Sequence, residues 1–173
     1  MPIILLIVST LAFWALYWFV QMGGIEHFRE RKKQREDDVK RAAAKEASRT
    51  APLRAVDDPR DAAAVLMLLI ARQNGDPTRE QIALIEDKLR TVFGLEHELT
   101  ERITQARFIA REAIDFDQAA GVFAALFKKK LTADERYQLV DMLEEVARHE
   151  KPSQAQIEAL TAFRPKIGLA AAL

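Results

Sequence analysis

The residue types that carry out chemistry are few in this sequence, and their spacing gives most of them a structural role. Cysteine is absent, which excludes a thiolate zinc site, an iron–sulfur cluster and a cysteine nucleophile. A serine nucleophile needs a general base that holds its hydroxyl. The serines and histidines available for such a pair are scattered along the chain: Ser9, Ser48, Ser153, His27, His97 and His149. We therefore expect no catalytic residue, no cofactor and no small-molecule substrate, and we predict that the protein is not an enzyme.

The remaining charged groups do not change that expectation. Adjacent carboxylates are typical of helix caps and solvated faces rather than of an acid–base pair: Asp115/Asp117, Glu86/Asp87 and Glu144/Glu145. No glycine-rich phosphate-binding loop is present. The chain of 173 residues has 26 Lys plus Arg and 26 Asp plus Glu, so its net charge is zero. A nucleic-acid-binding protein normally carries a basic excess, and nucleic acid is therefore not an expected partner.

An apolar segment near the N-terminus predicts a membrane anchor. Residues 2–20 contain no side chain that ionises at neutral pH, and a helix of 19 residues spans about 28 Å, close to the ~30 Å of a bilayer's hydrocarbon core. Trp14, Tyr17 and Trp18 follow near its end, where aromatic side chains occupy the headgroup region. A cleaved signal peptide is the alternative, but its basic leader is missing. We expect residues 1–24 to form a single-pass anchor in lipid.

Basic residues after the anchor predict its orientation. The positive-inside rule places everything after Gly24 in the cytoplasm, which puts the N-terminus outside the bacterial inner membrane. Arg31, Lys32 and Lys33 are either this topology signal or a contact for lipid or a partner, and interleaved acidic residues favour the topology signal. Residues 25–57 are expected to form a charged helical connector. Its helix should end at Thr50–Pro52, because the residue before proline avoids the helical region, and residues 51–57 should be a linker.

Residues 58–169 show helical periodicity and predict an all-α bundle. Capping residues mark most of the helix starts, at Asp58, Thr78, Asp115, Thr132 and Ser153. The six expected helices run from Asp58 to Asn74, from Thr78 to Gly94, over about 96–113, from Asp115 to about 128, from Thr132 to about 149, and from Ser153 to near Phe163 before Pro165. Residues 170–173 are an apolar tail. The apolar stretch from Ile167 onward either packs on the bundle or docks elsewhere.

An internal repeat appears when the chain is shifted by 75 positions. Val65, Met67 and Leu68 then align with Val140, Met142 and Leu143, and Pro77-Thr78 with Pro152-Ser153. Gln81 and Ile82 likewise align with Gln156 and Ile157. Apolar positions recur by chance in amphipathic helices, but the shared capping pair does not follow from periodicity. We predict two related helical hairpins.

Two further surface and core features complete the domain. Phe108, Phe116, Phe123 and Phe127 are expected in the core, the last three on one helical face. Lys128, Lys129 and Lys130 form the one concentrated basic run of the domain. They suit the end of a helix, and contact with anionic lipid or an acidic partner is the alternative.

The two hairpin loops resemble the TerB-like family, which is named for tellurite resistance and also occurs in membrane-anchored DnaJ-like co-chaperones. The family pattern is Ala-x-x-Asp-Gly-x-[Ile/Leu]-Ser-x-x-Glu, and the matching stretches here are residues 71–81 (ARQNGDPTREQ) and 146–156 (VARHEKPSQAQ). Phe93-Gly94-Leu95 resembles the usual ending of the second helix. The resemblance implies a duplicated helical fold over about 58–169. No His-Pro-Asp string occurs, so it does not extend to a J domain.

The resemblance also implies a divalent-metal site, which this sequence alters. The family's loop Asp and helix Glu are replaced by Asn74 and Gln81 in the first copy, and by His149 and Gln156 in the second. Ca²⁺ binding usually needs several carboxylates. Asp76 and Glu80 are the nearby substitutes, so the candidate metal residues are Asn74, Asp76, Glu80, Gln81 and His149. We expect no metal at these positions.

These features predict a membrane-anchored, non-enzymatic interaction module that faces the cytoplasm and docks on a protein partner. The resemblance implies a role in envelope or tellurite stress, and an accessory subunit of a membrane complex is equally compatible. The alternative is a divalent-metal-responsive sensor that uses the inter-helix loops.

Overall fold

The computed structural model describes residues 40–41, 47–48, 50–113 and 115–170. The chain divides into two units, Met1–Glu46 and Ala47–Leu173, and the second contains the helices discussed below. Among the described residues, no helix combines the length and the apolar composition needed to cross a bilayer. The predicted anchor and its flanking charges lie outside them: Trp14, Tyr17, Trp18, Arg31, Lys32 and Lys33.

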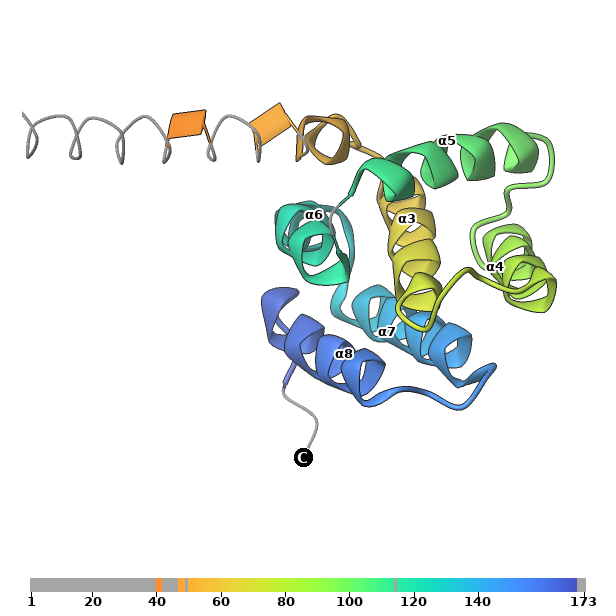
Figure 1. Cartoon of the computed structure of the whole chain (residues 1–173). Coiled ribbons are helices and arrows are strands. Elements are labelled where there is room, and N and C mark those ends of the chain that lie inside the picture. The colour runs from red at the N-terminus through yellow and green to blue at the C-terminus, as the bar shows by residue number, and fades with distance from the viewer. Residues whose placement is uncertain (1–39, 42–46, 49, 114, 171–173) are drawn as a thin grey trace, which may run out of the picture. The chain divides into compact units, whose positions relative to one another are not determined.

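The second unit is an all-α bundle, as predicted, and no strand occurs in the described part of the chain (Figure 1). Its helices are α3 (Pro59–Arg72), α4 (Arg79–Thr91), α5 (Leu99–Glu112), α6 (Phe116–Lys130), α7 (Ala133–Arg148) and α8 (Gln154–Lys166). The helix pairs α3–α4 and α7–α8 are the two predicted hairpins, while α5 and α6 connect them.

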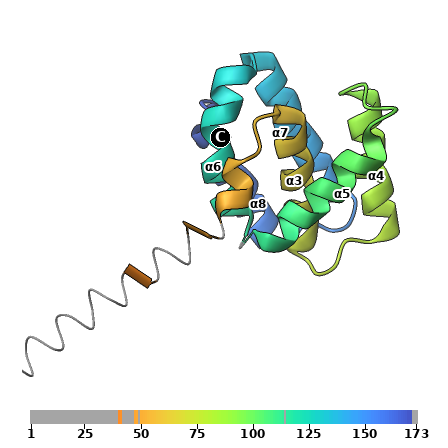
Figure 2. The same cartoon turned by 90° about the horizontal axis from the view of Figure 1, so that it is seen from above.

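Helix α3 is the centre of the bundle. Helices α4, α5, α6 and α7 all pack against it, and the two views show them on different sides of it (Figures 1 and 2). Every residue from Ala62 to Ala71 is buried, so α3 has an apolar surface on all sides rather than one apolar stripe. A helix of that composition is stable only inside a core.

The predicted capping residues start their helices. Thr78 and Gln81 form a complete capping box at α4, and equivalent boxes open α7 at Thr132 and α8 at Ser153. Asp58 and Asp115 cap α3 and α6 through their carboxylates. In each case a side-chain oxygen accepts from a backbone N–H of the first turn, which has no partner within its helix.

Two helix ends differ from prediction, and both involve proline. Residues 50–54 are helical, so the helix continues through Pro52, where we expected a linker. Leu53 is buried in the core, and this burial offsets the backbone hydrogen bond that proline cannot make. Helix α8 likewise includes Pro165. There, Gly168 adopts φ +76°, and the N–H groups of Gly168 and Leu169 donate to Pro165 and Arg164 in a Schellman closure.

The prediction for the aromatic residues was right for three and wrong for one. Phe116, Phe123 and Phe127 are buried, and Phe163 packs edge-on against the first and the last of them. Phe108 instead has 60% of its surface exposed, because it lies on the side of α5 opposite the stripe that packs inward. At the C-terminal end, Ile167 and Leu169 are buried and therefore pack on the bundle; residues 171–173 are not among those described.

Candidate functional site

The loop of each hairpin lies at the same end of the bundle (Figure 1), and a pair of amide side chains joins them. Asn74 follows α3, and its Nδ2 donates to Oε1 of Gln156 in the first turn of α8, at 2.9 Å. Nε2 of Gln156 donates to the carbonyl of Ile70 in α3, at 2.8 Å. One side chain of the second hairpin thus holds both the loop and the last turn of the first.

Gln156 also closes its own helix. Its Oε1 accepts from the backbone N–H of Ser153 at 3.0 Å, which is half of the capping box. The side chain is fully buried, so each of these hydrogen bonds replaces one that water would otherwise supply.

Gln81, its counterpart in the first hairpin, is less well satisfied. Its Oε1 accepts from the backbone N–H of Thr78 at 3.0 Å, and the residue is 2% exposed. Its Nε2 is buried and has no hydrogen-bond partner in the described part of the protein. The cross-link made by Gln156 is therefore not repeated by Gln81.

The other candidate metal residues do not converge on this junction. His149 is the exposed C-cap of α7, and Glu80 is exposed in the first turn of α4. Asp76 lines a separate cavity of about 450 Å³ together with Arg72, Arg107 and Arg111, among others. Over the described residues, no three His, Asp or Glu side chains gather where they could hold a metal ion.

The opposite end of α3 carries a network of ion pairs. Asp58 accepts from Nε and Nη2 of Arg60, and from Nη1 of Arg102 in α5 at 2.9 Å. Arg102 also pairs with Asp61 at 2.8 Å and with Glu98 at 2.8 Å. The hydrogen bonds from Arg60, with a smaller contribution from Arg102, hold the pKa of Asp58 well below its usual range against the opposing effect of burial. Hydrogen bonding to Glu98 in turn raises the pKa of Arg102.

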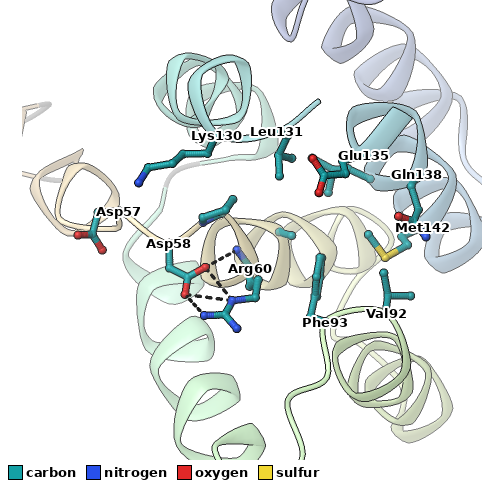
Figure 3. Close-up of a pocket in the computed structure, with 13 residues that line it drawn as sticks. Asp57, Asp58, Arg60, Val92, Phe93, Lys130, Leu131, Glu135, Gln138 and Met142 are labelled. Carbon is teal, nitrogen blue, oxygen red and sulfur yellow. Dashed lines mark hydrogen bonds and ion pairs between the residues drawn. The ribbon is translucent and has the colours of Figure 1, made fainter. Parts of the chain in front are cut away.

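Beside this network a cleft of about 600 Å³ opens between the two hairpins (Figure 3). Its apolar lining comes from the end of α4, from the α6–α7 turn and from α7, and consists of Val92, Phe93, Leu131, Leu139 and Met142, with Pro59 and Ala63 of α3. Its polar lining consists of Asp57, Asp58, Arg60, Lys130, Glu135 and Gln138. We call this feature the α3–α7 cleft.

Most charged groups of the α3–α7 cleft are already paired. Asp58 and Arg60 bind one another, and Glu135 accepts from the backbone N–H of Thr132, which with the Thr132 hydroxyl lowers the pKa of this carboxyl. Lys130 is exposed in the last turn of α6 and forms no hydrogen bond or ion pair within the described residues. Of the predicted basic run, Lys130 alone lines the cleft, since Lys128 and Lys129 do not.

Two of these features were not predicted from the sequence. Gln156 was predicted as a cap and as an altered metal position, but not as a link between the hairpins, because its contact with Ile70 joins residues 86 apart and leaves no local signal. The α3–α7 cleft combines residues from four separate segments, of which only Lys130 was predicted as a possible contact for a partner. An acid three residues after a Thr cap signals Glu135, but as a helix start rather than as part of a cleft.

Comparison with known proteins supports the predicted resemblance. Residues 60–149 match the family model described as tellurite resistance protein TerB. This match begins in the first turn of α3 and ends at His149, before α8. No curated protein and no solved structure shows significant similarity to the chain.

Proposed function

The chain belongs to the TerB family, and from that premise we propose that it is a non-enzymatic interaction module tethered to the cytoplasmic face of the bacterial inner membrane. The α3–α7 cleft is the observation that carries this proposal. Its volume lies in the range of ligand sites, but a small-molecule site needs polar groups that converge on the ligand. Here Asp58 and Arg60 pair with one another and Glu135 is held by Thr132, so these groups do not converge on a common point.

The chemistry of the α3–α7 cleft fits a protein side chain. Phe93, Val92 and Leu131 are partly exposed and offer apolar contact from different segments. Lys130 offers a cation whose ammonium is not engaged by any described residue. The partner that fits best presents an apolar side chain next to a carboxylate.

The proposed tether is the segment of residues 2–20, whose length and apolar composition suit a single helix across the bilayer. Basic residues after Gly24 favour a cytoplasmic position for the remainder. A module held in this way searches for partners in or near the membrane, which suits an accessory subunit of a membrane complex. The family description also supports a role in tellurite resistance.

Site-specific photocrosslinking tests the docking role. A photoreactive residue at Gln138, in the α3–α7 cleft, should yield one discrete crosslinked product in cells. The same residue at Gln154, which is exposed on α8 and does not line the cleft, is the control. Equal products from both positions, or none from Gln138, would contradict docking in the cleft.

Protease accessibility tests the tether separately. In sealed inside-out vesicles, protease should remove the helical unit, whereas in spheroplasts the same unit should be protected. The opposite pattern would reverse the topology, and recovery of the full chain in the soluble fraction would exclude the anchor.

A further inference from the structure

The hairpin junction of this chain does not suit a hard cation. Ca²⁺ takes 6–8 oxygen ligands, usually with carboxylates among them. The resemblance places Asn74, Gln81, His149 and Gln156 at the metal positions, and none of these is a carboxylate. Oε1 of Gln156 already accepts from Asn74 and from Ser153, and Oε1 of Gln81 accepts from Thr78. The two glutamine oxygens that a cation would need are therefore engaged by N–H donors.

The amide of Gln156 can donate a hydrogen bond to a buried carbonyl oxygen, whereas a carboxylate at this position could not. Gln156 is fully buried, and its Nε2 faces the carbonyl oxygen of Ile70 at 2.8 Å. A glutamate there would set two acceptors against each other and would bury a charge, which needs a cation to compensate it. The amide is neutral, and it supplies its own donor to Ile70 and its own acceptor to Asn74.

We propose that the amide pair Asn74–Gln156 fastens the two hairpins to one another without a metal ion, so that assembly of this module does not respond to divalent cations. The inference is independent of the docking function, because the junction lies at the end of α3 opposite the α3–α7 cleft. Its consequence is that a metal-responsive sensor is disfavoured for this chain. The fastening is also one-sided, since Gln81 makes no equivalent contact among the described residues.

Thermal unfolding of the full chain in detergent tests the metal independence. The midpoint should be the same in excess EDTA and in millimolar Ca²⁺ or Mn²⁺. A saturable rise of the midpoint with either cation, or a fall in EDTA, would overturn the proposal.

A double-mutant cycle tests the pair itself. Asn74→Ala and Gln156→Met should each lower the midpoint, the second by roughly 5 °C or more, because it removes the buried donor at 2.8 Å and leaves the Ile70 carbonyl only the 3.4 Å hydrogen bond from the backbone N–H of Gln73. The double variant should lose less than the sum of the two shifts, since the contact can be removed only once. Additive shifts would show that the pair contributes nothing. Gln154→Met is the matched control, because Gln154 is exposed in the same helical turn.

If Gln156→Met does not fold, two other measurements test the Asn74–Gln156 pair. In the unmodified chain, the side-chain amide protons of Gln156 should exchange with solvent far more slowly than those of Gln154; equal rates would overturn the proposal. Gln156→Glu should unfold at a lower temperature at neutral pH and should regain part of the loss on acidification, when the buried carboxyl takes up a proton and again donates to Ile70. A midpoint equal to that of the unmodified chain at neutral pH would also overturn it.

Discussion

Arg102 in α5 and Asp58, the N-cap of α3, are joined by an ion pair of 2.9 Å between Nη1 and Oδ2, across 44 residues of sequence. Asp58 thereby contacts two helices: its carboxylate pairs with Arg102 of α5 and also accepts from the backbone N–H of Arg60 in the first turn of α3. The pair is about 20% exposed on both sides, so solvent screens it less than a surface salt bridge.

Replacing Asp58 by alanine should destabilise the bundle. The change removes the cap of α3 and leaves Arg102 with fewer acceptors, and the cap alone accounts for about 1–2 kcal/mol. Urea unfolding followed by circular dichroism measures the loss. Asp58→Asn is the matched control, because asparagine caps equally well but carries no charge; it should lose less than alanine.

The same residue should contribute to stability in a pH-dependent way. The pKa of Asp58 is lowered in the folded protein, chiefly by hydrogen bonds from Arg60, so the folded state binds a proton less readily than the unfolded chain. Its contribution is complete above the ordinary aspartate pKa of about 4 and is lost as the pH falls below that value. Asp58→Asn should therefore show a shallower decline of stability on the acid side. Parallel declines in the two proteins would contradict the assignment.

Charge reversal at Lys130 should weaken partner capture without unfolding the protein. Lys130 lines the α3–α7 cleft, whereas Lys129 is also exposed but does not line it. Loss of one favourable rim contact costs about 1 kcal/mol, or roughly a fivefold drop in crosslinking yield at subsaturating partner. Lys129→Glu is the matched control and should crosslink normally. Equal losses from both variants would indicate a general effect of charge instead.

Gly168 should not tolerate alanine. Its φ of +76° lies in the left-handed region, and an added Cβ would approach Nη1 of Arg136 to 2.9 Å. That guanidinium donates to the carbonyl of Ile167, so a shift would disturb the Schellman closure. We expect a loss of about 1–2 kcal/mol in urea unfolding. Gly121→Ala is the control: Gly121 lies inside α6 with open space around it and should gain about 0.5–1 kcal/mol.

Substitution of Phe108 by serine should change the free energy of unfolding by no more than about 0.5 kcal/mol, since the ring is mostly exposed. Phe116→Ala, by contrast, should cost about 3–5 kcal/mol, because its ring is buried against Phe163. Both values come from the same denaturation experiment. A large loss at Phe108 would show that this face of α5 is covered in the protein as purified.

The helix starts could be predicted from the sequence because capping is local chemistry. Thr78 and Gln81 are three residues apart, and their reciprocal hydrogen bonds need no other part of the chain. The helix ends at Pro52 and Pro165 could not be predicted in this way. There the outcome depends on the burial of Leu53 and Ile167 by distant segments, which outweighs the local preference.

The candidate site was less predictable for the same reason. The amide substitutions at Asn74 and Gln156 are visible in the sequence, but their direct contact depends on how the two hairpins pack. The prediction that Phe108 is buried was wrong for a different reason. Helical spacing places Phe108 opposite the buried stripe of Ile103, Ala106 and Ala110, and this spacing indicates exposure. The prediction of burial gave the apolar character of the ring more weight than its position on the helix.

The burial of α3 on all sides from Ala62 to Ala71 limits what the sequence repeat means for folding. The two halves look alike in sequence, yet the first contributes a helix that neighbours from both halves enclose. A fragment that ends before α6 would expose to water the side of α3 that packs against α6 and α7. A fragment that begins at α6 would lack α3, against which α6 and α7 pack. Although its sequence shows a repeated pattern, the domain should fold as one cooperative unit.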